Sequence, residues 1–127
     1  MNLDYLNGLT PNILDGEISF MKKFEQARRI MFSDCDNAQI VFYPKYFEWF
    51  DRATQSMFDE VGLHWSKMWP QYNIAGIPLV DAQAKFMAPL RMEDDIIIES
   101  WVEEWSGKVG IVRHNVLKGD VIHVDPY

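Results

Sequence analysis

The longest regular hydrophobic pattern in the chain runs from Pro44 to Val61 and has the period of an α-helix. Apolar side chains recur there at spacings of three and four residues, which places them in one stripe along a helix. Proline suits the first turn of a helix, whose N–H groups lack intrahelical partners, and Gly62 favours a helix end. We predict a long, largely buried helix whose apolar face consists of Tyr46, Phe50, Ala53, Met57 and Val61, widened by Phe47, Trp49 and Phe58.

After this helix the pattern changes to a period of two, which is typical of half-buried strands. It predicts strands at 79–86, 96–105 and 109–117, with a short last stretch at 121–124. Short glycine-containing turns separate the later strands, so these neighbours are expected to pair antiparallel. A less regular alternation at 24–32 predicts a first strand.

This order of elements predicts an α+β domain, an antiparallel sheet packed around one helix. A single long helix is too little for a doubly wound parallel sheet. The segment 63–78 is an apolar connector with room for a short helix. Residues 1–21 carry turn residues and no sustained period, so we interpret them as an N-terminal arm with one helical turn from Thr10 to Leu14. The domain itself is assigned to 22–127.

Composition and charge narrow the classes of function. The 127 residues are enough for one domain, and 48% of them are hydrophobic, as in ordinary globular proteins. The net charge of −7 argues against non-specific binding to nucleic acid or to an anionic membrane. No apolar run approaches the roughly 20 residues of a membrane span. Because Cys35 is the only cysteine and no secretory leader is recognised, we expect a cytoplasmic protein.

The sharpest candidate for chemistry is the turn that contains Asp34, Cys35 and Asp36, ahead of the predicted helix. Free N–H groups at a helix N-terminus favour negative charge. A carboxylate beside them can attack an acyl carbon, or activate water, while the N–H groups hold the carbonyl oxygen. The two aspartates can equally be turn and capping residues, and spacing alone favours that interpretation.

Other reactive side chains have simpler interpretations. Cys35 has no histidine near it in sequence, which favours an unreactive buried thiol. His114 alternates with strand residues and is expected to pack or to form a hydrogen bond within the sheet. The chain's histidines show no ligand spacing, so we expect no metal. Three aromatic residues of the connector can line an acyl pocket or pack in a core or interface: Trp65, Trp69 and Tyr72.

The stretch from Phe32 to Tyr46 (FSDCDNAQIVFYPKY) resembles the signature of the 4-hydroxybenzoyl-CoA thioesterase family of hot-dog proteins. The similarity continues around 49–51, 76–80 and 104–114. It implies the hot-dog fold, in which an antiparallel sheet wraps around one long central helix. It also implies hydrolysis of an acyl-CoA thioester, with coenzyme A as part of the substrate and no other cofactor.

The resemblance assigns roles by position. Asp36 matches the family's catalytic aspartate, a nucleophile or general base, and the backbone N–H of Tyr43 would polarise the thioester carbonyl. Asp51 matches a helix aspartate near the acyl group of aromatic substrates, although it can also be an exposed polar residue. Lys108, and less directly Arg113, would meet the phosphates of coenzyme A.

The sequence also departs from the family pattern. Gln39 stands where the family usually has glycine, so a left-handed backbone there would be strained. Asn37 replaces a common proline, and the C-terminal strand is short or missing. These departures motivate a second hypothesis, a non-catalytic module that binds acyl-CoA or an acyl-carrier protein. A hot-dog dehydratase is disfavoured because no histidine has an acid partner.

We also expect the chain to associate with copies of itself. The single predicted helix covers one face of the sheet and leaves apolar residues on the other side. A homodimer would cover them and would place the site at a subunit interface. The family resemblance implies a homodimer or a homotetramer.

Overall fold

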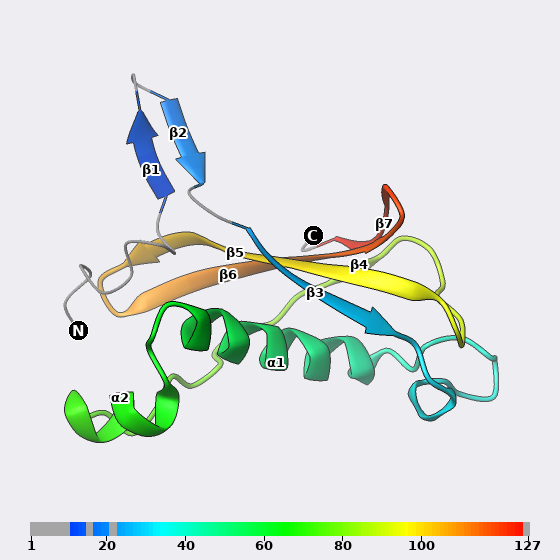
Figure 1. The fold of residues 1–127 in the computed structure, drawn as a ribbon, viewed down its shortest axis with the longest axis horizontal. Coiled ribbons are helices and arrows are strands. Elements are labelled where there is room, and N and C mark those ends of the chain that lie inside the picture. The colour runs from blue at the N-terminus through cyan, green and yellow to red at the C-terminus, as the bar shows by residue number, and fades with distance from the viewer. Residues whose placement is uncertain (1–10, 15–16, 21–22, 126–127) are drawn as a thin grey trace.

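A five-stranded antiparallel sheet packed on one long helix forms the body of the protein (Figure 1). The computed structural model describes residues 11–14, 17–20 and 23–125. The order of strands in the sheet is β3-β5-β6-β7-β4. These strands are β3 (Phe24–Arg29), β4 (Lys85–Phe86), β5 (Asp95–Ser106), β6 (Val109–Lys118) and β7 (Val121–Asp125). The predicted α+β architecture, an antiparallel sheet around one helix, is confirmed.

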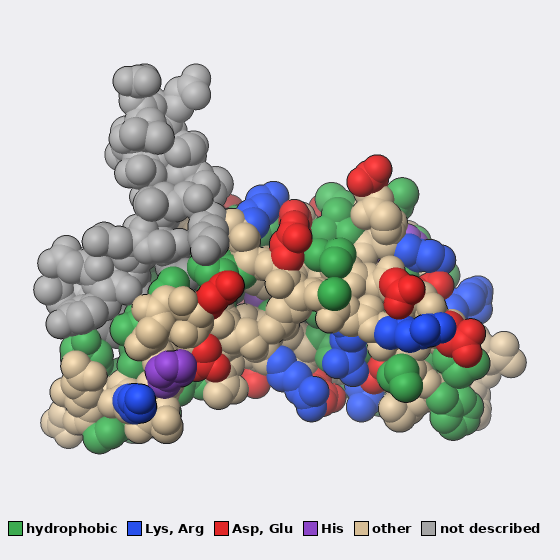
Figure 2. Space-filling model, viewed as in Figure 1, with side chains coloured by type: hydrophobic (Ala, Val, Ile, Leu, Met, Phe, Trp, Pro, Cys, Tyr) green, Lys and Arg blue, Asp and Glu red, His purple; other side chains and the backbone are tan. Residues whose placement is uncertain are grey.

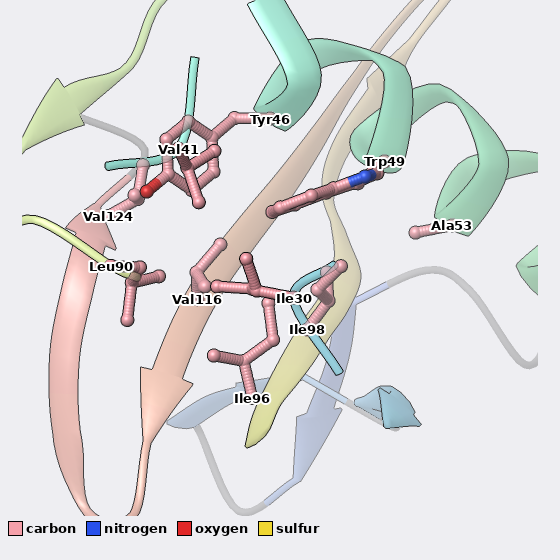
Figure 3. Packing of buried hydrophobic residues seen from close by; sticks show 10 residues of the cluster. All are labelled: Ile30, Val41, Tyr46, Trp49, Ala53, Leu90, Ile96, Ile98, Val116 and Val124. Atoms are coloured by element: carbon pink, nitrogen blue, oxygen red, sulfur yellow. The ribbon is translucent and has the colours of Figure 1, made fainter. Parts of the chain in front are cut away.

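The long helix α1 (Pro44–Glu60) has nearly the predicted bounds. Pro44 occupies its first position, and Gly62 follows its end with a φ of +82°. Its buried face packs on the sheet and forms the larger hydrophobic cluster (Figure 3). No helix in the described part of the chain is both long and apolar enough to cross a membrane. The residues of α1 in this cluster are Tyr46, Trp49 and Ala53, and those of β5, β6 and β7 are Ile96, Ile98, Val116 and Val124.

The predicted period of two holds along β5, where alternate side chains are buried against α1. The pairing of β5 with β6 continues this face across the sheet, since Ser100 of β5 pairs with His114 of β6 on the helix side. Trp101 pairs with Arg113 on the opposite side. Acidic and basic side chains are interspersed on the face shown in Figure 2, so the net negative charge is not segregated there.

Two predicted strands are shorter than expected. The first ends at Arg29 rather than at residue 32, because the chain leaves the ladder and forms a 3-10 turn, Phe32–Asp34. The strand predicted at 79–86 pairs only at β4, against β7. Leu79, 81% exposed, precedes it in a segment that pairs with no strand of the described residues. The half-buried face predicted there is wrong for residues 79–83, whose side chains are all exposed, because a strand needs a partner and a layer that covers one of its faces.

The connector and the termini complete the fold. The short helix expected in the connector is α2 (Trp65–Gln71). The short last stretch is β7, which pairs with both β6 and β4.

The helical turn predicted at 10–14 is wrong: β1 (Pro11–Leu14) pairs with β2 (Glu17–Phe20) in a separate hairpin. An Asp-Gly pair lies between these strands in the sequence, and that dipeptide favours a hairpin turn. The rest of the arm lies outside the described residues.

Candidate active site

The loop between β3 and α1 holds the residues singled out from the sequence. Cys35 and Val41 form an isolated antiparallel bridge, which closes residues 36–40 into a small loop. Inside it, the N–H of Asp36 donates to the carbonyl of Ile40 at 3.1 Å. The N–H of Gln39 donates to the carbonyl of Asp36 at 2.9 Å. The loop therefore has a defined shape, with Asp36 at its beginning.

The carboxylate of Asp36 is exposed and serves the turn with one oxygen. Its Oδ1 accepts the N–H of Ala38 at 2.9 Å. Its Oδ2 meets no donor among the residues the structure describes. Asp36 is thus a turn residue, as the simpler interpretation held, and its second carboxylate oxygen has no partner within the described part of the chain.

Gln39, which stands where the family usually has glycine, has a left-handed backbone. Its φ is +63°, in the left-handed region that glycine adopts without penalty. For a residue with a Cβ, this conformation costs roughly 1–2 kcal/mol. The side chain is exposed, so no packing contact requires glutamine at this position.

The N-terminus of α1 leaves one main-chain donor without a partner. Pro44 has no N–H, Lys45 donates to the carbonyl of Phe42 at 2.9 Å, and Tyr46 donates to the carbonyl of Tyr43 at 3.1 Å. Within residues 23–125, no acceptor contacts the N–H of Tyr43. This donor sits at the positive end of the helix dipole, only two residues after the loop closes at Val41.

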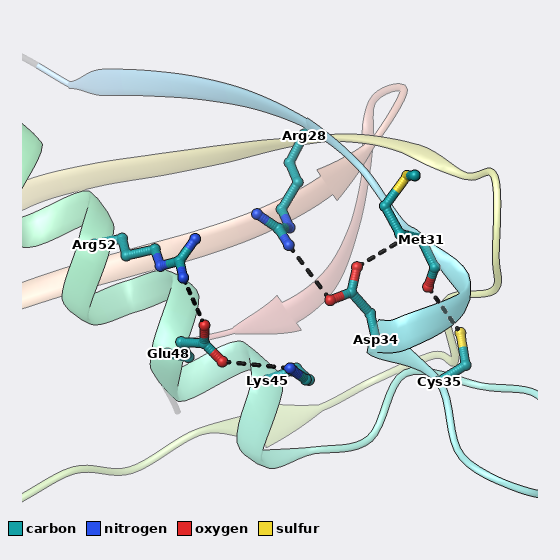
Figure 4. Close-up of polar contacts among 7 residues, drawn as sticks. All are labelled: Arg28, Met31, Asp34, Cys35, Lys45, Glu48 and Arg52. Atoms are coloured by element: carbon teal, nitrogen blue, oxygen red, sulfur yellow. Dashed lines mark hydrogen bonds and ion pairs between the residues drawn. The ribbon is translucent and has the colours of Figure 1, made fainter.

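The other two residues of the acidic turn are less available. Asp34 is buried and bonded to Arg28 and to the N–H of Met31 (Figure 4). Burial, followed by the charge of Asp34, raises the pKa of the Cys35 thiol. Because the thiolate is the nucleophilic form, this environment favours the interpretation of Cys35 as an unreactive thiol.

The three residues expected to bind substrate do not all lie at this end. Asp51 is exposed on α1. Arg113 is buried on the sheet face away from α1, where its Nε donates to Glu103 at 2.7 Å. Lys108 lies in the turn after β5, a strand of 12 residues that spans roughly 36 Å. Since Arg29 pairs with Asp95 at the start of β5, the loop of Asp36 and the turn of Lys108 occupy opposite ends of the sheet.

A partly buried polar chain crosses between α1 and the sheet, and sequence reasoning found only part of it. The ring of His114 stacks on Phe50, with 4.7 Å between centroids. Its Nδ1 lies 2.7 Å from Oγ of Ser100, and its Nε2 lies 3.4 Å from Oγ1 of Thr54. Burial lowers the pKa of His114 to about 4, so the imidazole is neutral at pH 7.

The direction of these hydrogen bonds follows from Thr54. Its hydroxyl donates to the carbonyl of Phe50 at 2.9 Å, so Oγ1 is left to accept from the Nε2–H of His114. Nδ1 then accepts the hydroxyl proton of Ser100. His114 was expected to be a packed or hydrogen-bonded strand residue, and it is both. The register that brings Ser100 to it could have been inferred only by aligning the two strands.

Aromatic side chains of α1 continue from His114 toward β4. Phe47 contacts Phe50 at 6.1 Å between ring centroids, and Phe86 lies 5.4 Å from Tyr46 and 6.5 Å from Phe47. The aromatic residues of the connector lie elsewhere: Trp65 stacks on Trp69, and both pack with the second hydrophobic cluster. An apolar wall therefore lies along α1 between the sheet and its β4 edge.

The protein has a long helix wrapped by an antiparallel sheet, with a carboxylate loop at the N-terminus of that helix. It is a thioester hydrolase of the hot-dog fold. Residues 30–124 match the model of the Thioesterase-like superfamily. The chain belongs to this superfamily, and the family resemblance found in the sequence is confirmed.

Individual relatives agree with this assignment. The 4-hydroxybenzoyl-CoA thioesterase of Pseudomonas sp. (strain CBS-3) is 36% identical over 99 residues, which are 74% of this chain and 70% of that protein. The solved structure of a gentisyl-coenzyme A thioesterase aligns with a TM-score of 0.72 at 33% identity, over 80% of this chain and 82% of that one. A mutant 4-hydroxybenzoyl CoA thioesterase complexed with 4-hydroxybenzoyl CoA aligns with a TM-score of 0.72 at 32% identity, over 81% and 76%.

Proposed function

We propose that this protein hydrolyses acyl-CoA thioesters at the loop between β3 and α1. The observation that carries the proposal is that the loop and the start of α1 hold two groups without a partner among the described residues, a carboxylate oxygen of Asp36 and the N–H of Tyr43. One group can attack, and the other can accept the charge that the attack creates. The names of the similar proteins, which act on 4-hydroxybenzoyl-CoA and gentisyl-CoA, support the same chemistry.

In the proposed reaction, the thioester carbonyl oxygen accepts the N–H of Tyr43. Asp36 attacks the acyl carbon, the C–S bond breaks, and coenzyme A leaves as a thiolate that takes a proton from solvent. Water then hydrolyses the mixed anhydride and restores the carboxylate. Alternatively, Asp36 takes a proton from a water molecule that attacks directly. In either case the helix dipole and the N–H stabilise the oxyanion, and no metal or other cofactor is required.

We propose an aromatic acyl group as the substrate. The wall of Phe47, Phe50 and Phe86 offers ring faces and edges at contact distances typical of aromatic packing. Asp51, one residue after Phe50 on α1, is available to accept a hydrogen bond from a ring hydroxyl. The relatives named above support this choice, since both of their substrates carry hydroxylated aromatic acyl groups.

We further propose that the working unit is a homodimer or homotetramer in the cytoplasm. Lys108 is too far from Asp36 of its own chain for both to hold one substrate, so cations for the coenzyme A phosphates would come from a second copy. The open edge beside β4 supports this association, because apolar side chains of residues 77–87 are exposed along it. The one cysteine of the sequence suits a reducing compartment.

The test is release of free thiol from a panel of aromatic and aliphatic acyl-CoAs. Asp36→Asn should lower kcat by about 10²–10⁴-fold, the range expected for loss of a catalytic acid or base. Asp120→Asn, in the exposed turn between β6 and β7, is the matched control and should retain full activity. Aromatic substrates should be preferred over aliphatic ones.

Two results would contradict the proposal. Equal activity of wild type and Asp36→Asn would remove Asp36 from the mechanism. Failure to hydrolyse any acyl-CoA, with binding of coenzyme A intact, would favour the non-catalytic binding module. The strained backbone at Gln39 would then be the first candidate cause of the lost activity.

A further inference from the structure

Asp34 is a carboxylate buried between the end of β3 and the start of α1, with only 2% of its surface exposed. Its Oδ2 accepts the N–H of Met31 at 2.9 Å. Its Oδ1 forms an ion pair with Arg28 at 3.3 Å (Figure 4). A buried carboxylate is costly unless its oxygens are bonded, so these two contacts explain why an ionised group is tolerated there.

The main chain of Asp34 reaches the other arm of the loop. Its carbonyl accepts the N–H of Phe42 at 2.9 Å, and its own N–H donates to the carbonyl of Met31 at 3.0 Å. Phe42 is the residue directly before Tyr43, and Asp34 lies two residues before Asp36. One residue thus joins the strand side of the loop, through its carboxylate, to the helix side, through its carbonyl.

Arg28 extends this connection to α1. Its guanidinium lies 4.7 Å from the centre of the Trp49 ring, on the buried face of the helix, while it holds Asp34. The strand β3, the loop and the helix α1 are therefore all in contact with the ion pair of Arg28 and Asp34. Asp36 and Tyr43 are both exposed, so the main chain of the loop sets their separation, and Asp34 connects both arms of that main chain.

We propose that Asp34 is a positioning residue for the thioesterase reaction. Its buried carboxylate locks the two arms of the loop so that the carboxylate of Asp36 and the N–H of Tyr43 face the same carbonyl group. This inference rests on the function proposed above. A displacement of about 1 Å between catalytic groups can cost about 10²-fold in rate, so a residue that never touches the substrate can still control kcat.

The experiment compares Asp34→Asn with Asp94→Asn. Asp94 is a matched control because it also accepts a main-chain N–H, from Arg91 at 2.8 Å, and pairs with a cation, Lys118 at 2.9 Å. It makes no hydrogen bond to residues 34–42. Both variants are assayed below their unfolding temperatures. Asp34→Asn should lower kcat by about 10–100-fold with KM changed less than about threefold, and Asp94→Asn should change neither by more than about threefold.

A second variant separates positioning from general loss of stability. Because Asp34 is proposed to act through Asp36 and Tyr43, Asp34→Asn should cost little further activity once Asp36→Asn is present. The proposal would be overturned if Asp34→Asn lowered kcat by the same factor in wild type and in Asp36→Asn. A kcat loss in Asp94→Asn as large as that in Asp34→Asn would also overturn it.

Amide hydrogen exchange provides a readout that does not depend on activity. In Asp34→Asn the N–H groups of Ala38 and Phe42 should exchange at least about tenfold faster, while amides in the centre of β5 keep their rates. If wild type hydrolyses no acyl-CoA but this local change occurs, the proposed function fails, whereas the role of Asp34 in holding the two arms of the loop stands. Uniform acceleration of all amides, or no change at Ala38 and Phe42, would overturn the positioning role.

Discussion

At the scale of single residues, the loop before α1 combines defined turn geometry with local strain. The N–H of Ala38 and the carboxylate of Asp36 close the turn, and Gln39 accepts a left-handed backbone within it. Strained conformations persist where surrounding contacts hold them, and they recur at functional sites. Here the bridge between Cys35 and Val41 provides that support.

The strain at Gln39 predicts an unusual order of stabilities. Gln39→Gly should stabilise the protein by roughly 0.5 kcal/mol, because relief of the left-handed penalty slightly exceeds the added entropy of the unfolded chain. Gln39→Ala keeps the Cβ and should gain nothing. Urea unfolding of the three proteins measures this, and a glycine variant no more stable than the alanine variant would contradict it.

At the scale of elements, α1 meets the sheet through apolar contacts, through the contact of Arg28 with Trp49 and through a polar chain. Ser100, His114 and Thr54 form that chain, and each of their hydrogen bonds is made with a neutral partner. Buried polar groups are stable when they are bonded in this way, and costly when one of them acquires a charge. The docking of the helix is therefore sensitive to protonation of His114.

Stability should fall in mild acid because of His114. The unfolded chain binds a proton at this residue near its ordinary pKa of 6.5, whereas the folded protein resists protonation until a pH of about 4. The stabilisation from neutral His114 is complete above about pH 6.5 and is lost progressively as the pH falls toward 4, by roughly 3 kcal/mol.

Urea unfolding at several pH values, for wild type and His114→Gln, measures this contribution. Glutamine can still form hydrogen bonds but does not titrate, so carboxylates and the other histidines contribute equally to both curves. The wild-type curve should be steeper between pH 6.5 and 4. Parallel curves would show that His114 does not control acid stability.

At the scale of the whole molecule, one chain carries its candidate catalytic loop and its candidate phosphate-binding lysine at opposite ends of the sheet. It also carries an exposed apolar segment just before the edge strand β4, where Leu79 and Val80 are 81% and 83% exposed. Exposed sheet edges with apolar side chains favour pairing with another strand. Association of two chains through this edge would explain both features.

A charge on this edge should separate the chains and abolish activity. Val80→Lys places a charge among the exposed apolar residues beside β4 and should shift sedimentation from an oligomer to a monomer. Val121→Lys is the matched control, since Val121 is 60% exposed in β7 but lies outside the edge. An active monomer of Val80→Lys would refute the need for a shared site.

Local pattern by itself determined much of this protein. The period of the apolar residues identified α1 and the alternation of β5 and β6, because periodicity depends only on neighbouring residues. The motif around Asp36 identified the family and the position at Gln39 where a left-handed backbone was required. Proline at the start of α1 also follows from local rules.

Only the tertiary structure decided the features that depend on pairing between distant segments. It brought Ser100 to His114, buried Asp34 against Arg28, and separated Lys108 from Asp36 by the length of β5. It also shortened the strand predicted at 79–86, because a hydrogen-bonded ladder requires a second strand that no local pattern supplies. Periodicity determines how a segment is built, whereas contacts across the fold determine which side chains meet.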